Sequence, residues 1–281
     1  MKISYTEYEL IELQKCLNPD TGFLYFLSNY YNIQDPVRGI ILYKPYEYQI
    51  RLLKEFHNRS RTIALLFRQS GKTVTALGYL LWYAMMNPYK TVVIVTRNKY
   101  SAADAMHRIR TAYELCPEYI KCQTTIMNKT LIDFDNGSRI IIEPASENMC
   151  RGMTISLLYI DEFAFMQDNV ASYICRNMMP TIANVGKIII TSTKNTENDM
   201  FARIWKGSNN VMYDSIKNQW QVHITDYNSS TVINPENNGF YAIRVGWDGH
   251  PTRDEVWKQE QIYNIGPARF TIEYEPDFIS Q

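Results

Sequence analysis

Short runs of apolar residues alternate with longer amphipathic stretches through most of the chain. Apolar runs of strand length with no polar positions between them are typical of parallel strands that are covered on both faces. Such strands are expected at 62–67, 91–95, 156–160 and 187–191. Stretches with helical spacing lie at 46–56, 73–86 and from 101 to near 116. This alternation predicts a doubly wound, mostly parallel α/β core over residues 46–210.

Further elements are expected on both sides of this core. An Asp-Asn-Gly sequence between alternating apolar stretches predicts a β-hairpin over 130–143. The aromatic cluster Phe23–Tyr31 indicates buried packing within a helical N-terminal segment, residues 1–45. In residues 211–281, a short β pair is expected around 220–225 and a helix over 253–264, so this region combines the end of the core with a linker.

Composition excludes several classes of protein. Of 281 residues, 46% are apolar and 21% are charged, which is ordinary for a globular domain with a sizeable core. The 29 basic residues balance the 29 acidic ones, so net charge gives no argument for nucleic-acid binding. The 5 cysteines form no C-x-x-C pair, which favours reduced thiols in a cytosol-like compartment over a zinc site or disulfides. Neither a signal peptide nor a membrane span is expected, because the apolar runs are too short.

A candidate phosphate-binding loop follows the first predicted strand of the core. It consists of Arg68, Gln69, Ser70, Gly71, Lys72 and Thr73. The pattern G-x-x-x-x-G-K-[ST] is met except at its first glycine, which is Leu66 here. Backbone N–H groups at a helix start form an anion cradle, a lysine reaches the terminal phosphates, and a threonine hydroxyl suits Mg²⁺. The loop therefore predicts binding of a nucleotide with Mg²⁺.

Two adjacent carboxylates end the strand predicted at 156–160. Asp161 is expected at the carboxyl edge of the sheet, where open α/β folds bind their ligands, and it would hold Mg²⁺ there. Glu162 would orient or deprotonate an attacking water, which favours a hydrolase over a kinase. The alternative is a solvated pair that caps the next helix.

Two arginines are candidates for stabilising transition-state charge. Arg68 lies inside the loop, where a planar guanidinium can bind phosphate oxygens in a bidentate manner; the alternative is a structural or solvent-facing arginine. Arg151 precedes Gly152 and follows a polar stretch, so it is a candidate finger supplied to a neighbouring subunit's nucleotide, or equally a surface residue that ends a turn.

Polar side chains at two other places extend the candidate site. Tyr48 and Gln49 precede the loop, and a glutamine amide offers the paired donor and acceptor that an adenine edge requires. Thr191, Ser192 and Thr193 lie at the end of the strand at 187–191, where hydroxyls can sense nucleotide state and pass it to a moving part. An ordinary helical glutamine and a helix N-cap are the alternatives.

In this order, the motifs resemble the ATPase domain of the large terminase subunit of tailed bacteriophages. The resemblance covers residues 46–206 and rests on Tyr48-Gln49, the loop RQSGKT, TVVIVTRN, Arg151-Gly152, YIDE and IIITST. That family tolerates loss of the first loop glycine and keeps an arginine there. The loop is its Walker A motif, and YIDE is its Walker B motif.

The resemblance implies a P-loop fold of the RecA- and helicase-like class, with an additional strand and a catalytic glutamate. It implies a molecular motor that hydrolyses ATP with Mg²⁺ to package double-stranded viral DNA, in a ring of five subunits on the portal protein, together with the small terminase subunit, in the host cytoplasm. Arg68 would act in cis and Arg151 in trans. The terminal segments would form a small lid subdomain, and no nuclease activity is expected from residues 1–281.

Two other functions fit the same motifs. A helicase-like DNA translocase shares the glutamine, the phosphate loop and the Asp-Glu pair, but it normally brings a second RecA-like domain. A nucleotide-gated module that docks on a portal without turnover has no need of Glu162.

Overall fold

The strands of the core form where the apolar runs were expected, and their side chains alternate between two hydrophobic clusters. The computed structural model describes residues 5–150, 152–182, 186–214, 219–222 and 238–275. In β3 (Arg61–Leu66), Ala64 and Leu66 join one cluster while Ile63 and Leu65 join the other. Successive side chains of a strand point to opposite faces, so an uninterrupted apolar strand requires cover on both.

Within the described residues, the central sheet has 10 strands, and its middle is parallel. In spatial order they are β11 (Gln219–Val222), β10 (Asn209–Asp214), β12 (Tyr241–Val245), β3, β9 (Lys187–Ser192), β8 (Leu157–Asp161), β4 (Thr91–Thr96), β7 (Arg139–Pro144), β6 (Leu131–Phe134) and β5 (Thr124–Met127). Strand β9 pairs with both β3 and β8, so one additional strand separates the strand before the phosphate loop from the strand that ends in Asp161. This order confirms the expected RecA-like class.

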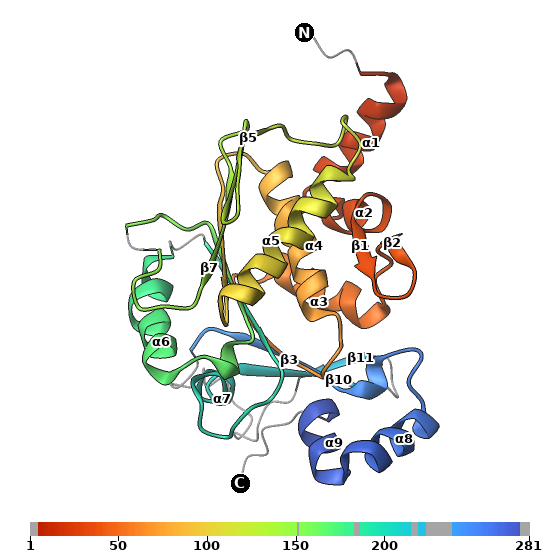
Figure 1. Ribbon diagram of the computed structural model, residues 1–281, viewed down its shortest axis with the longest axis vertical. Helices are drawn as coiled ribbons and strands as arrows, with labels where there is room; N and C mark the ends of the chain where they lie inside the picture. Colours follow the sequence, from red (N-terminus) through yellow and green to blue (C-terminus); the bar gives the residue numbers. More distant parts are fainter. Residues whose placement is uncertain (1–4, 151, 183–185, 215–218, 223–237, 276–281) are drawn as a thin grey trace, which may run out of the picture.

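Helices cover the two faces of the sheet (Figure 1). One face carries α3 (Glu47–Asn58), α4 (Lys72–Met86) and α5 (Lys99–Glu114), and the other carries α6 (Asp168–Tyr173) and α7 (Met200–Lys206). The hairpin expected at 130–143 forms from β6 and β7, which pair antiparallel around Gly137 with its φ of 79°. The doubly wound, mostly parallel α/β fold is therefore confirmed.

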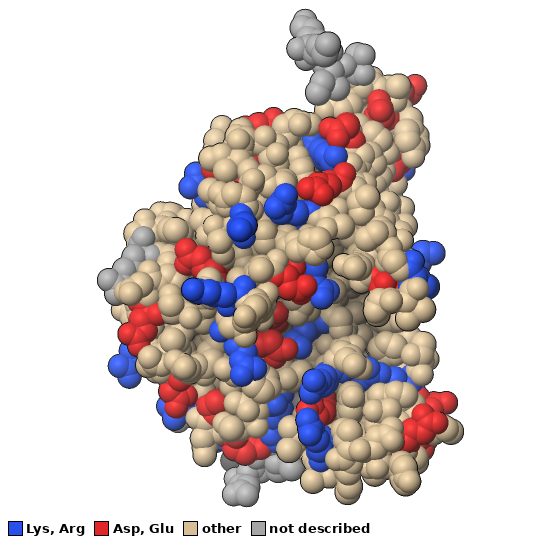
Figure 2. All heavy atoms as spheres, viewed as in Figure 1, with Lys and Arg blue, Asp and Glu red and all other residues tan. Residues whose placement is uncertain are grey.

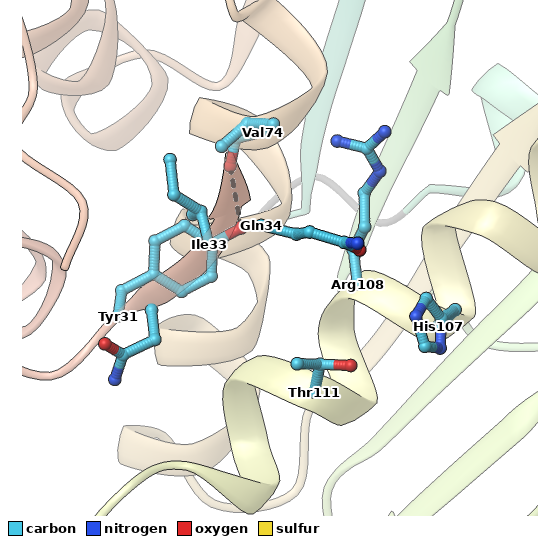
Figure 3. A pocket seen from close by; sticks show the side chains of 8 residues that line it. Tyr31, Ile33, Gln34, Val74, His107, Arg108 and Thr111 are labelled. Atoms are coloured by element: carbon cyan, nitrogen blue, oxygen red, sulfur yellow. Dashed lines mark hydrogen bonds between the residues drawn. The ribbon is translucent and has the colours of Figure 1, made fainter. Parts of the chain in front are cut away.

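The N-terminal segment packs onto α4. It contains α1 (Glu7–Leu17), α2 (Gly22–Asn29) and an antiparallel pair, β1 (Asn32–Asp35) with β2 (Gly39–Leu42), which the sequence did not predict. The ring of Tyr31 packs directly against Gly78 of α4. A Cβ at this position would lie only 2.7 Å from the ring, so α4 needs a glycine there. The Tyr31 hydroxyl donates to the carbonyl of Val74, in the first turns of α4 (Figure 3). The segment thus supports the helix that begins at the phosphate loop.

Figure 3 also shows a small hollow beside this contact, between β1 and α5. His107, Arg108 and Thr111 of α5 line it from one side. Its volume of about 10 Å³ is close to the minimum that one water molecule needs, so it has no room for a nucleotide.

The C-terminal segment reaches the sheet edge that carries the phosphate loop. It contains α8 (Glu255–Ile265), close to the helix expected at 253–264, and α9 (Pro267–Tyr274), which was not predicted. Both helices lie together at one end of the molecule (Figure 1). The β pair expected around 220–225 is formed by β10 and β11, and residues 223–225 lie outside the described part of the chain. No helix in the described part is both long and apolar enough to cross a bilayer.

Candidate nucleotide site

The phosphate loop turns through two left-handed residues between β3 and α4. Gln69 has a φ of 64° and Gly71 a φ of 72°. A Cβ at Gly71 would lie 2.8 Å from Nε2 of Gln49, so both the backbone conformation and the space favour glycine. Leu66, at the position of the missing first glycine, is the last residue of β3 and is fully buried. The turn therefore begins after this position, and a glycine is not required there.

Tyr48 and Gln49 bind the backbone of this loop through their side chains. The carbonyl of Ser70 accepts hydrogen bonds from the Tyr48 hydroxyl at 2.7 Å and from Nε2 of Gln49 at 2.9 Å. The other side of the Gln49 amide accepts from the Tyr43 hydroxyl and the Tyr46 N–H. In this conformation, the donor side of the buried amide binds the loop, and its acceptor side binds the residues before α3. Adenine recognition by Gln49 stays a prediction, and it would require these bonds to be exchanged.

Asp161 and Thr73 lie side by side where the sheet meets the loop. The Thr73 hydroxyl donates to Oδ2 of Asp161 at 2.9 Å. Burial raises the pKa of Asp161, and the nearby charge of Lys72 opposes that rise. One hydroxyl and one carboxylate oxygen at a phosphate cradle are the hard ligands that Mg²⁺ takes together with substrate phosphates and water. The residues present therefore fit the expected metal.

Glu162 lines a hollow next to Lys72 and Asp161, and its backbone is strained. Its φ of 53° is left-handed, which is uncommon for a residue with a side chain and is found disproportionately at active sites. Its Oε1 lies 2.6 Å from Nζ of Lys72, and its side chain is 31% exposed. The hydroxyl of Ser192 donates to Oε2 at 3.5 Å. The alternative of a simple solvated cap is not what the structure has, because Glu162 makes no side-chain cap bond to the short helix after it.

The three hydroxyl residues at the end of β9 contact the two carboxylates or line the hollow. Thr191 is fully buried and donates to Oδ1 of Asp161 at 3.1 Å. Ser192 accepts from the N–H of Ala164, next to the Glu162 turn, at 3.2 Å. Thr193 lines the hollow in front of the carboxylates. The structure thus brings the predicted coupling residues together with the predicted catalytic strand.

The two arginines differ in what the structure describes. Nη1 of Arg68 lies 2.9 Å from Oε1 of Glu273 in α9, and its side chain is 57% exposed. The backbone N–H of Arg68 also donates to the carbonyl of Glu273, at 2.7 Å. Arg68 thus lines the hollow while paired with a carboxylate of the C-terminal segment. Arg151 lies outside the described residues.

Two adjoining hollows of about 490 and 540 Å³ share Lys72, Asp161 and Glu162 on their walls. Each is within the size range of small-molecule sites. Sequence reasoning missed further polar residues that line the first hollow, among them Arg97, Lys194, Asn195 and Glu273. The first three closely follow β4 and β9 at the carboxyl edge of the sheet, a position that could have indicated them. Glu273 carried no such signal.

The fold and family are shared with known proteins. The family model described as terminase large subunit, T4likevirus-type, N-terminal, matches residues 63–271. The ATPase domain of the Thermus phage P74-26 large terminase is similar, with a TM-score of 0.60 at 21% identity over 84% of this chain and 95% of that one. The HK97 bacteriophage large terminase has a TM-score of 0.56 at 16% identity, over 90% of this chain and 48% of that one.

A third similar structure contains a nucleotide. It is the large terminase of a thermophilic bacteriophage in complex with ATP-gamma-S, and it has a TM-score of 0.55 at 10% identity, over 84% of this chain and 53% of that one. The chain thus spans nearly the whole of an isolated terminase ATPase domain and about half of the larger terminases. By its family match over residues 63–271, and with the sheet order and phosphate loop described above, this chain belongs to the family of terminase large subunit N-terminal domains of the T4likevirus type.

Proposed function

We propose that this chain hydrolyses ATP with Mg²⁺ and uses the energy to drive double-stranded viral DNA into a procapsid. One observation carries the proposal: a lysine–glutamate pair, Lys72 with Glu162, and a threonine–aspartate pair, Thr73 with Asp161, meet at one edge of the sheet. The first pair supplies a phosphate-binding cation and a base, and the second supplies oxygen ligands for a cation. Mere binding of a nucleotide needs no such base.

Each residue has a distinct task in this mechanism. The N–H groups of the loop and Lys72 would bind the phosphates, while Thr73 and Asp161 would hold Mg²⁺, whose positive charge would stabilise the negative charge of the phosphates. Glu162 accepts a proton from the attacking water. Its carboxylate is paired with Lys72, so phosphates that bind this lysine would draw it away and free the base.

The remaining assignments extend the proposal to assembly. Arg68 would leave Glu273 and stabilise transition-state charge in cis, and Arg151 would act in trans on a neighbouring subunit. The ring of five subunits on the portal protein, the small terminase subunit as a partner and the host cytoplasm as location belong to the same proposal. On the face drawn in Figure 2, basic and acidic side chains are interspersed among the described residues, so assembly or local contacts would have to provide the grip on DNA.

The deciding experiment compares wild-type protein with Glu162→Gln, a substitution that keeps the shape and removes the base. Both should bind Mg-ATP, and the variant should hydrolyse it about 10²- to 10⁴-fold more slowly. Steady-state ATPase rates are measured against protein concentration, with and without duplex DNA and portal. If both proteins bind Mg-ATP and neither hydrolyses it under any of these conditions, the motor proposal is wrong and a nucleotide-gated module is favoured.

A mixing experiment tests the role in trans. Inactive Arg151→Ala protein should regain part of its activity when it is mixed with inactive Glu162→Gln protein, because one kind of mixed interface then has both groups. Mixed assembly is verified by cross-linking. Mixed rings without any regained activity would show that Arg151 does not act on a neighbour's nucleotide.

A further inference from the structure

A fully buried tyrosine lies directly beneath the carboxylate of Asp161. Tyr159 precedes Asp161 by two positions in β8, so both side chains leave the strand on the same face. The Tyr159 side chain is 0% exposed. Its hydroxyl donates to Oδ1 of Asp161 at 3.1 Å and lies 2.8 Å from the hydroxyl oxygen of Thr191 in β9. A phenol placed in the core needs such partners, and here they belong to the candidate site.

The two oxygens of Asp161 have separate environments. Oδ1 faces into the protein and accepts from Tyr159 and Thr191, while Oδ2 accepts from Thr73 on the phosphate loop. Partners behind a metal ligand fix its orientation, and their loss commonly weakens metal binding 10- to 100-fold. Because Oδ1 is bound by Tyr159 and Thr191, Oδ2 is the oxygen that Asp161 offers to a cation next to Thr73.

We propose that Tyr159 is a positioning residue that orients Asp161 for Mg²⁺ and joins it to Thr191 on the neighbouring strand. The inference rests on the proposed function, because it concerns the metal of the same site. It adds a residue outside the phosphate loop and the Asp161-Glu162 pair, and it gives the hydroxyl of Thr191 a second partner besides Asp161.

The hydroxyl protons make this arrangement adjustable. Tyr159 and Thr191 have one hydroxyl proton each, yet there are three short contacts among their oxygens and Oδ1 of Asp161. Both protons can point to Asp161, or one can serve the contact between the two hydroxyls while the other serves Asp161. When a cation draws electron density from Asp161, its carboxylate becomes a weaker acceptor. The pattern with a hydrogen bond between the two hydroxyls is then favoured over the pattern in which both hydroxyls donate to Asp161. The trio thus links the charge at Asp161 to the contact between β8 and β9.

The test replaces Tyr159 with Phe, which keeps the ring in the core and removes only the hydroxyl. Tyr79→Phe is the matched control, because Tyr79 is equally buried and its hydroxyl bonds weakly, at 3.5 Å, to the carbonyl of Phe56. Binding of a fluorescent ADP is measured as Mg²⁺ is titrated, and again in EDTA. Tyr159→Phe should raise the half-saturating Mg²⁺ about 10- to 100-fold and leave binding in EDTA unchanged. Tyr79→Phe should match wild type in both measurements.

A second variant covers the other half of the contact. Thr191→Val should raise the half-saturating Mg²⁺ concentration as well. In the double variant, Tyr159→Phe with Thr191→Val, this concentration should increase by less than the product of the two single effects, because the two hydroxyls share one carboxylate oxygen. If Tyr159→Phe has the same Mg²⁺ dependence as Tyr79→Phe while wild type binds ADP with Mg²⁺, the positioning role is wrong and the proposed function stands. If wild type binds no ADP at any Mg²⁺ concentration, both the proposed function and this inference are wrong.

Discussion

The segments before and after the α/β sheet both pack against it, but they use different side chains to do so. In the N-terminal segment, Phe23, Phe26 and Leu27 of α2 are at most 1% exposed and belong to the same cluster as α4. In the C-terminal segment, α8 has no buried residue, and α9 buries Phe270 and Tyr274. The first segment is therefore part of the body of the domain.

The C-terminal segment joins the same cluster through Phe270 and Tyr274 of α9, and a cation and ion pairs add to this attachment. The guanidinium of Arg253 lies 4.6 Å from the ring centre of Phe67 and 4.3 Å from that of Trp257. Glu273 pairs with Arg68 of the phosphate loop. Breaking ion pairs and cation–ring contacts costs less free energy than opening a close-packed core. Among the described residues, the contact between a flank and the phosphate loop is of this kind. Nucleotide-dependent movement is therefore expected of the C-terminal flank, whereas the lid role foreseen for both flanks stays a prediction.

The largest effect is expected from the N-terminal side. Phe26→Ala removes a ring that is 0% exposed, so it should lower the free energy of unfolding by about 3–5 kcal/mol, as measured by urea denaturation. Tyr8→Ala on α1, where the side chain is 63% exposed, should change it by less than about 0.5 kcal/mol. A loss below about 1 kcal/mol for Phe26→Ala would remove the contrast between the flanks, since the N-terminal segment would then be as loosely attached as the other.

A smaller and more local effect is expected from the C-terminal side. Phe270→Ala should release α8 and α9 before the rest unfolds, because their attachment depends on few buried rings. Hydrogen exchange in 255–274 should accelerate about tenfold or more, while exchange in β3 and β8 stays slow. Uniform acceleration across the sheet would show instead that the flank unfolds only with the whole domain.

The N-terminal flank should also respond to acid. Hydrogen bonds from Lys15, Tyr25 and Tyr30 lower the pKa of Glu12 from 4.5 to about 2. A carboxyl whose pKa is lowered by folding stabilises the protein above its unfolded pKa and loses that contribution as pH falls toward the folded value. The difference in unfolding free energy between wild type and Glu12→Gln should therefore shrink from about pH 5 to about pH 3. A difference that is constant over this range would exclude a role for the charge.

The smallest change in stability is expected at the phosphate loop. Glu273→Gln removes the charge that pairs with Arg68, whose side chain is 57% exposed, so stability should fall by less than about 1 kcal/mol. Affinity for ATP should nevertheless increase several-fold, because Arg68 no longer has to leave a carboxylate. Glu260→Gln, at an exposed position of α8, is the control for charge alone. An unchanged affinity would mean that the contact with Glu273 does not compete with nucleotide.

The central strands and the position of the candidate site residues at their ends were predictable because both depend on local pattern. An apolar run such as Leu157–Ile160, with no charged position inside it, is typical of a covered strand, and the carboxylates directly after such a strand are expected at its carboxyl edge. The β1–β2 pair was missed because its residues are half-buried or exposed and show no apolar alternation. Helix α9 was missed because its few buried residues depend on a surface that the rest of the fold creates.

The partners of the site residues could not be predicted. Arg68 and Glu273 are 205 positions apart, and nothing near either one indicates the other. Gln49 was interpreted as a base-reading amide from its chemistry alone, whereas its neighbours come from two stretches of backbone: Tyr43 and Tyr46 precede α3, and Ser70 lies in the phosphate loop. Such contacts follow from the sheet order, and that order follows from the packing of the whole domain.

The place of β3 within the sheet has a consequence for synthesis on the ribosome. Its partners arrive late: Ile63 pairs with Ile190 of β9 on one side and Ala242 of β12 on the other. Until β12 has left the ribosome, β3 is an unpaired sheet edge, and such edges invite association with other chains. The phosphate loop is thus among the first functional sequences to be translated and among the last to be completed. Any shortened version of this domain intended to bind nucleotide must retain β12.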